Sequence, residues 1–175
     1  MSKLKKGYIQ VYMGDGKGKT TAAFGLALRA LGYGLKVFIA QFIKEGEYNE
    51  IKALKLLGEN IVIKQYGSGF FIRNKPKEEE VKLAKNGLKE LKDIIKSEKY
   101  DLLILDEINV ALYFKLISLE DILDIVCTKP DHTEMVFTGR KVAKEIVELA
   151  DLVTEMREIK HYYSSGIQAR NGIEK

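Results

Sequence analysis

Apolar and polar positions along the chain alternate between short runs typical of strands and longer periodic stretches typical of helices. Segments rich in β-branched and aromatic residues, bounded by turn residues, predict strands. We expect strands at residues 8–13, 37–42, 61–65, 102–105, 134–138 and 152–156. The run from Leu102 to Leu105 is apolar at every position, as expected of a central strand that is buried on both faces of a sheet.

Helical periodicity fills the intervals between these strands. In the clearest case, apolar residues recur at steps of three and four from Val81 to Ile95, while Lys and Glu fill the other positions. Further helices are expected at residues 20–31, 50–57, 118–127 and 141–150, and a surface loop at 66–75. The alternation predicts an α/β fold with a mostly parallel sheet, helices on both faces, and a single domain over residues 1–175.

Composition sets limits on the class of protein. The 175 residues are 46% hydrophobic and 31% charged, as in globular proteins. No apolar run reaches the roughly 18 residues of a membrane helix, and the segment after the basic start is too short for a signal peptide. We therefore expect a cytoplasmic protein with no membrane partner.

Charge and cysteine content narrow the expectations further. The net charge is +4, with Lys and Glu interleaved and no basic stripe carrying aromatic residues, so no nucleic-acid partner is expected. The single cysteine, Cys127, has no Cys or His neighbour at a metal-ligand spacing. We expect it to be a small buried apolar residue rather than a nucleophile.

The strongest chemical signal follows the first predicted strand, where the sequence reads Gly14-Asp15-Gly16-Lys17-Gly18-Lys19-Thr20-Thr21 before a predicted helix. Glycines let backbone N–H groups turn toward phosphate oxygens, and a helix N-terminus adds partial positive charge. Lys19 supplies a full charge, and the Thr20 hydroxyl is placed to bind Mg²⁺. The pattern predicts a loop that binds a nucleoside triphosphate, most simply ATP. Its opening is unusual, because Met13 stands where such loops commonly have glycine.

Charged residues also follow two later strands. Asp106 and Glu107 end the apolar strand, where proteins with phosphate-binding loops hold magnesium. Arg140 follows the strand at 134–138, where a guanidinium is able to contact phosphate. Two plainer interpretations stay open: an acidic cap at a strand end, and a surface arginine at a helix start.

Together with further blocks, these residues resemble the corrinoid adenosyltransferases of the CobA/BtuR/CobO type. The family also uses the shortened loop opening seen at Met13. The blocks that carry the resemblance run in order along nearly the whole chain: residues 14–27, Arg29-Ala30, Gln41-Phe42-Ile43-Lys44, Gly69-Phe70, Leu105-Asp106-Glu107, Thr138-Gly139-Arg140 and the tail from Lys160 to Ile173.

The resemblance implies a RecA-like P-loop fold, a homodimer and a specific reaction. In that reaction the Co(I) of a reduced corrinoid attacks the 5′ carbon of ATP, inorganic triphosphate leaves, and Mg²⁺ assists. A flavodoxin-like reductase is the implied source of Co(I). The physics agrees, since a leaving triphosphate needs concentrated positive charge, here expected from Lys19, Arg140 and the loop N–H groups.

Carried over by position, the resemblance implies that Gly14–Thr21 contact the phosphates and that Arg29 lies near the nucleoside. It implies that Thr20, Glu107 and the adjacent Asp106 hold the metal. Phe70 and Ile72 are assigned to the corrinoid, although family members commonly have tryptophan where Ile72 stands. His161 is open to a catalytic interpretation, but a structural hydrogen-bonding role is favoured.

Two other functions stay open on the sequence alone. One is a conventional ATPase or small-molecule kinase that transfers the γ-phosphate, and the other is a non-catalytic module that binds a nucleotide or corrinoid. Neither a substrate base nor an arginine-rich lid is evident, which disfavours the kinase.

Overall fold

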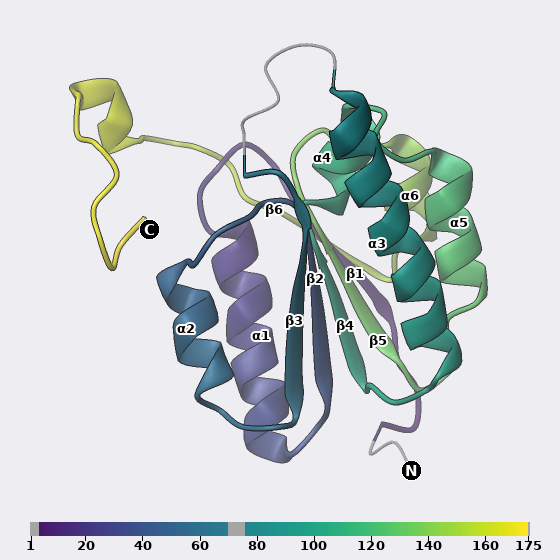
Figure 1. Ribbon diagram of the computed structural model, residues 1–175. Coiled ribbons are helices and arrows are strands. Elements are labelled where there is room, and N and C mark those ends of the chain that lie inside the picture. The colour runs from purple at the N-terminus through teal and green to yellow at the C-terminus, as the bar shows by residue number, and fades with distance from the viewer. Residues whose placement is uncertain (1–3, 70–75, 175) are drawn as a thin grey trace.

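Six parallel strands form one sheet in the order β3-β2-β4-β5-β1-β6 in the computed structural model, which describes residues 4–69 and 76–174. All five neighbouring pairs run parallel. The strands are β1 (Ile9–Met13), β2 (Val37–Ile43), β3 (Ile61–Gly67), β4 (Leu102–Asp106), β5 (Glu134–Thr138) and β6 (Leu152–Glu155). Figure 1 shows them side by side between two layers of helices.

The helices cover the two faces unequally. One face carries α1 (Lys19–Tyr33) and α2 (Asn49–Lys55). The other carries α3 (Glu78–Lys96), α4 (Ile108–Tyr113), α5 (Leu119–Cys127) and α6 (Lys144–Leu149), as Figure 1 shows. A short 3₁₀ helix, η1 (Tyr162–Ser165), lies in the tail after β6.

Alternate residues of the strands contribute side chains to two separate hydrophobic cores, because successive side chains of a strand point to opposite faces of the sheet. Ile39 and Ile104 pack in the core that contains the α1 residues Ala23 and Ala27. Phe38, Leu103 and Phe137 pack on the other side, in the core that contains the inward face of α3. The sheet is therefore held rigid from both faces, and it fixes the positions of the loops at its edge.

The predicted α/β class and the strand and helix pattern are confirmed, with differences at some boundaries. The helix expected at 141–150 begins only at Lys144, because Lys141 has a positive φ of 56° that no helix accommodates. The short helix α4 had no sequence signal of its own, since six residues are too few to establish a helical period.

The expected burial of Cys127 is wrong: its side chain is exposed. Ile122 and Ile125 hold the core face of α5, and both are completely buried. At about 100° per residue, Cys127 lies on the opposite side of the helix from Ile125. Position on the helix, rather than the apolar character of cysteine, decides its exposure.

Across the described residues 4–69 and 76–174, no helix has the length and apolar character needed to cross a membrane.

Candidate nucleotide-binding site

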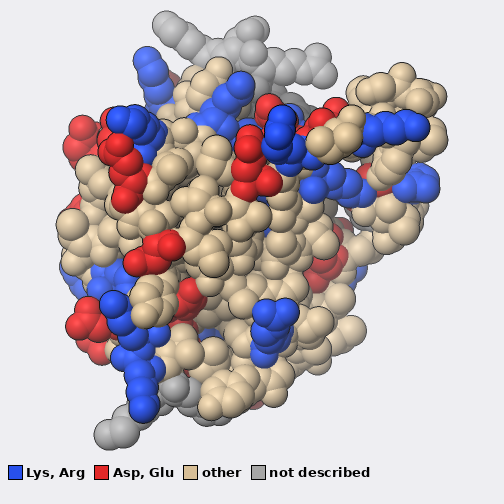
Figure 2. Space-filling model, turned by 180° about the vertical axis from the view of Figure 1, so that it is seen from behind, with Lys and Arg blue, Asp and Glu red and all other residues tan. Residues whose placement is uncertain are grey.

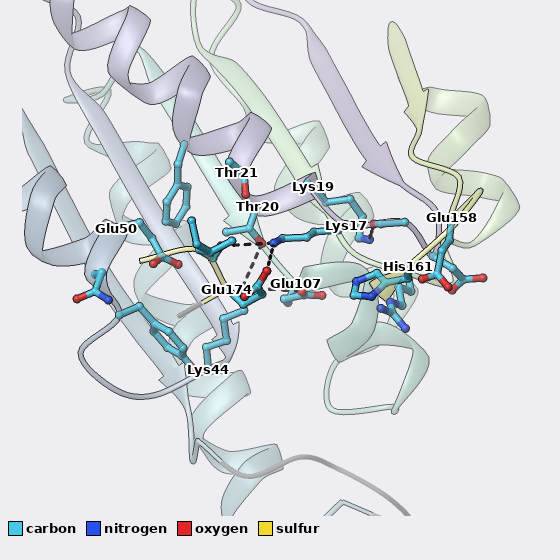
Figure 3. Close-up of a pocket in the computed structure, with 18 of the residues that line it drawn as sticks. Lys17, Lys19, Thr20, Thr21, Lys44, Glu50, Glu107, Glu158, His161 and Glu174 are labelled. Atoms are coloured by element: carbon cyan, nitrogen blue, oxygen red, sulfur yellow. Dashed lines mark hydrogen bonds and ion pairs between the residues drawn. The ribbon is translucent and has the colours of Figure 1, made fainter. Parts of the chain in front are cut away.

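A pocket of about 630 Å³ opens at the edge of the sheet where the parallel strands end. Figure 3 shows the side chains that line it. They come from the phosphate loop and the start of α1, the turn after β2, the start of α2, the ends of β4 and β5, and the C-terminal tail. This position, beyond the carboxyl ends of the strands, is the one at which open parallel sheets bind ligands.

The phosphate loop has the conformation that its glycines permit. Gly14 and Gly18 have φ values of 99° and 117°, which L-residues with side chains rarely adopt. Gly16 is held by a 2.7 Å hydrogen bond from its N–H to the carbonyl oxygen of Met156, and a Cβ there would meet that same oxygen at 2.7 Å. The loop is therefore packed closely against the chain that follows β6, and its backbone is fixed before a ligand arrives.

Lys19 is the buried cation of this loop. Its side chain lines the pocket with only 7% of the residue exposed, and Nζ donates a 2.7 Å hydrogen bond to the carbonyl oxygen of Gly16. Burial lowers the pKa of Lys19, and the positive charge of Arg140 lowers it further. The site thus holds two cations near each other that an anionic ligand would stabilise.

Asp106 is the most heavily hydrogen-bonded acid of the site. Its side chain is fully buried at the end of β4. The hydroxyls of Thr20 and Thr138 donate to Oδ1 at 2.8 and 2.7 Å. Gln41 Nε2 and Lys44 Nζ donate to Oδ2 at 3.0 and 2.8 Å. Burial would raise the pKa of Asp106, but the charge of Lys44 and these hydrogen bonds outweigh it, so the pKa lies below its ordinary value.

Glu107, the next residue, behaves differently. It lines the pocket, and its backbone has a φ of 60°, an uncommon value for a side-chain-bearing residue that often accompanies functional sites. Its N–H donates to Thr138 Oγ1 at 2.9 Å, which secures this conformation. Burial, followed by the charge of Asp106, raises the pKa of Glu107 above its ordinary value.

The donor atoms at this edge suit a magnesium ion. Thr20, Asp106 and Glu107 offer oxygen atoms, and Lys44 Nζ lies within 3.1 Å of Thr20 Oγ1, 2.8 Å of Asp106 and 3.8 Å of Glu107. No cluster of three or more His, Cys, Asp and Glu residues suited to a metal occurs in the described part of the chain. That finding is compatible with Mg²⁺, which usually binds nucleotide sites through one or two carboxylates, water and phosphates.

The C-terminal tail forms one wall of the pocket. Figure 1 shows it leaving β6 and crossing toward the side of α1. Lys17 Nζ donates to Glu174 Oε1 at 2.9 Å and to the Tyr162 hydroxyl at 3.0 Å, and the Tyr162 hydroxyl donates to Glu174. Arg170 also pairs with Glu174, at 3.1 Å. The phosphate loop and the tail are therefore joined through one carboxylate.

His161 lines the same pocket, and its Nδ1 accepts a 3.0 Å hydrogen bond from the backbone N–H of Tyr163. It caps the start of η1 in this way. The bond supports a structural role for one ring nitrogen.

Truncating the chain after Gly166 is expected to raise KM for ATP about tenfold, equivalent to about 1.4 kcal/mol of binding free energy. The truncation removes Gly172, Ile173 and Glu174 from the pocket wall. The melting temperature is expected to stay nearly unchanged, because this part of the tail buries no core residue. Kinetic titration with ATP and a thermal melt measure the two quantities. An unchanged KM would show that the tail wall does not contact the nucleotide.

The structure brings most of the predicted site residues together, but Gly14 and Arg29 are not among the residues that line the pocket. The loop residues Asp15 to Thr21 line the pocket with Glu107 and Arg140, and Asp106 lies directly behind them. Arg29 is exposed on α1 and does not line this pocket; it lies ten residues along the helix from Lys19, or about 15 Å of helical rise. Phe70 and Ile72 lie outside the described residues.

Three residues of the network received no role from the sequence alone: Gln41, Lys44 and Thr138. Gln41 lies within β2 and is the partner of Asp106 in the β2–β4 register, Lys44 directly follows β2, and Thr138 is the last residue of β5. One sequence signal could have revealed this network. Gln41 is the polar residue in the otherwise apolar run 37–43, and a buried glutamine requires a hydrogen-bond partner.

The fold and the site define a nucleotide-binding α/β protein with a phosphate-binding loop. Among solved structures, the flagellar accessory protein FlaH from Methanocaldococcus jannaschii is similar in fold, with a TM-score of 0.61 at 14% identity over 87% of this chain and 72% of that one. This likeness supports the RecA-like P-loop fold that the family resemblance implies.

Sequence comparison gives the family. Residues 5–174 match the family described as ATP:corrinoid adenosyltransferase BtuR/CobO/CobP. A corrinoid adenosyltransferase from Sinorhizobium sp. is 37% identical over 97% of this chain and 81% of its own length. Those of Escherichia coli K12 and Salmonella typhimurium LT2 are each 32% identical over 97% of this chain and 86% of theirs. The chain belongs to the ATP:corrinoid adenosyltransferase family and is a transferase, as its sequence predicts.

Proposed function

We propose that this chain transfers the 5′-deoxyadenosyl group of ATP to the reduced cobalt of a corrinoid and releases inorganic triphosphate. The observation that carries the proposal is the charge arrangement of the pocket in a chain of this family. Lys19 and Arg140 lie near enough for Arg140 to lower the pKa of Lys19, and both line the pocket with the phosphate loop. Such a site stabilises negative charge that develops on a leaving polyphosphate.

The proposed step forms one bond and breaks one. The electron pair of Co(I) forms the cobalt–carbon bond to the 5′ carbon, and the bond between that carbon and the triphosphate oxygen breaks. Its electron pair leaves on the triphosphate, so no phosphoryl group moves and no protein nucleophile is required. In this scheme the protein positions the two substrates and stabilises the leaving group.

Lys19, Arg140 and the N–H groups of the loop are assigned to the triphosphate. Lys19 is already desolvated and fixed against Gly16, so little rearrangement is needed when charge develops. Mg²⁺, when bound, would supply further positive charge to the phosphates, and Thr20, Glu107 and Asp106 are the residues proposed to hold it.

Product analysis tests the proposal. The protein is incubated with ATP, Mg²⁺ and chemically reduced cobalamin, and the nucleotide and phosphate products are separated. We expect adenosylcobalamin and inorganic triphosphate in equal amounts. ADP or orthophosphate as the only product would indicate γ-phosphate chemistry instead, and binding without turnover would indicate a non-catalytic module.

Phe70 and Ile72 are proposed to pack against the corrinoid, on the family resemblance alone. Large apolar side chains at this place would exclude water and the lower ligand of cobalt by their size. Isoleucine provides such a side chain, as the tryptophan common in the family does. Phe70→Ala combined with Ile72→Ala is expected to raise KM for the corrinoid about tenfold, as two large apolar contacts are lost, while KM for ATP stays unchanged. Steady-state titration of each substrate measures this, and unchanged corrinoid kinetics would refute the assignment.

A cytoplasmic homodimer supplied with Co(I) by a flavodoxin-like reductase remains part of the proposal. The edge strand β6 supports a self-association surface, since all four of its residues are exposed, including Leu152 and Val153. Figure 2, which views the molecule from behind, shows a broad uncharged area across the middle of that face, with acidic and basic side chains interspersed around it. Light scattering coupled to size-exclusion chromatography would measure the mass in solution.

A further inference from the structure

Lys44 extends from the end of β2 into the region expected to hold the metal (Figure 3). Its Nζ lies 2.8 Å from Asp106 Oδ2, 3.1 Å from Thr20 Oγ1 and 3.8 Å from Glu107 Oε1. These atoms belong to the three residues to which we assign magnesium. An ammonium group thus occupies a position among oxygen donors that also suit a hard divalent cation.

The charges of the site explain why an ammonium group lies there. The Asp106 side chain has no exposed surface, and a buried carboxylate without a counter-charge is costly. Lys44 supplies that counter-charge, while its own side chain remains 24% exposed and lines the pocket. Lys44 therefore has room to move into the pocket, whereas Asp106 is fixed by Thr138 and Gln41 on either side.

The backbone aims Lys44 at this position through a strained turn. Ile43 has a φ of 69°, which is rare for a β-branched residue, and the N–H of Lys44 donates to the carbonyl oxygen of Phe42 at 2.7 Å. Gly67 of the neighbouring strand lies against the turn, where a Cβ would meet Ile43 backbone atoms at 2.1 Å. Strain of this kind persists where the surrounding structure enforces it, and it commonly marks a functional position.

We propose that Lys44 is the internal counter-cation of the metal site: it holds the buried acids in the nucleotide-free protein and is displaced when Mg²⁺ binds with ATP. The inference rests on the proposed magnesium site. Two cations do not share these oxygens without strong repulsion, so Lys44 weakens metal binding in the absence of nucleotide. Once displaced, the ammonium group faces the pocket and adds a positive charge beside the triphosphate. Metal and nucleotide then bind together rather than the metal alone.

The test measures Mn²⁺ binding to the nucleotide-free, full-length protein from the electron paramagnetic resonance signal of free Mn²⁺. Lys44→Gln keeps a hydrogen-bond donor for Asp106 but removes the charge. We expect it to bind Mn²⁺ about tenfold or more tightly than the original chain, because a unit charge within a few ångströms is removed. Two control variants are expected to bind Mn²⁺ within about twofold of the original chain. Lys44→Arg keeps the charge at this position, and Lys55→Gln removes one charge at an exposed position of α2.

A second substitution locates the effect. Adding Asp106→Asn to Lys44→Gln is expected to abolish the gain in Mn²⁺ affinity. If Lys44→Gln binds Mn²⁺ no more tightly than the original chain, or if the gain survives Asp106→Asn, the proposal is overturned. If Lys44→Gln fails to fold without metal, Mn²⁺ is expected to restore its helical circular-dichroism signal, and failure to restore it would equally overturn the proposal.

The product assay keeps the two proposals separate. Triphosphate and adenosylcobalamin from the original chain, with equal Mn²⁺ affinity in Lys44→Gln, would refute the role of Lys44 alone. ADP as the product, with the tighter Mn²⁺ site present in Lys44→Gln, would refute adenosyl transfer and support the role of Lys44.

Discussion

Lys19→Met is expected to lower kcat/KM for ATP by about a thousandfold, which corresponds to about 4 kcal/mol of lost transition-state stabilisation. Methionine retains most of the length and apolar contacts of the lysine stem, so the loss reports the charge. Lys19 is desolvated in the pocket, where its interaction with a developing anion is much stronger than in water. Steady-state kinetics of adenosylcobalamin formation measure the change.

Lys17→Met is the matched control for Lys19. Lys17 belongs to the same loop, but it is exposed and already paired with Glu174. We expect its replacement to cost about tenfold or less, since an exposed and paired charge contributes little. If Lys19→Met retained activity within tenfold of the original chain, Lys19 would not carry the leaving-group charge. A change confined to KM would instead assign it to ground-state binding.

Asp106→Ala is expected to lower the free energy of unfolding by about 3 kcal/mol in the absence of ligands, the scale on which breaking a buried ion pair acts. The substitution leaves Lys44 without its nearest counter-charge and removes the acceptor for Gln41 and both threonine hydroxyls. Chemical denaturation followed by circular dichroism measures the loss. A change smaller than about 1 kcal/mol would contradict the view that Asp106 organises this edge of the sheet.

The contribution of Asp106 to the free energy of unfolding is expected to fall as the pH is lowered. The folded-state pKa of Asp106 lies below its ordinary value, so its contribution is fully present above about pH 4 and is lost as the pH falls through the folded pKa. The original chain should therefore lose stability on acidification more steeply than Asp106→Ala does. Unfolding curves recorded from about pH 6 to about pH 2 cover this window and compare the two slopes.

Glu107→Gln is the matched control for Asp106. Because burial and the adjacent Asp106 raise its pKa, the negative charge of Glu107 does not stabilise the folded protein as that of Asp106 does. Neutralising it is expected to leave stability unchanged or to raise it slightly. A loss as large as that of Asp106→Ala would show that the two neighbouring acids do not differ in the way their surroundings indicate.

The sequence predicted the strands and the phosphate loop well because both depend on local patterns. The apolar run before Asp106 and the glycines from Gly14 to Gly18 each fix their own conformation. The parallel sheet then follows from the alternation of elements, and it brings the strand ends to one edge. The position of Asp106 and Glu107 beside the loop was therefore predictable without any side-chain detail.

The remainder of the site depends on contacts between distant segments. Nothing local to Lys44 indicates that it pairs with Asp106, because its direction is set by the strained turn at Ile43 and the closeness of Gly67. Arg29 is a related case: the family correspondence gives its place in the sequence, while the structure shows it exposed on α1 and not among the pocket-lining residues, so its place near the nucleoside stays a prediction. The single domain and the individual roles of the site residues remain predictions.

The bond between Lys17 and Glu174 joins positions 157 residues apart. During synthesis every strand of the sheet and the complete phosphate loop are made before the tail residues Gly172, Ile173 and Glu174 that line the pocket. Domains begin to fold during synthesis, and contacts between distant residues form late. The contact between the tail and the phosphate loop is therefore expected to form after the sheet, as the last step that shapes the pocket.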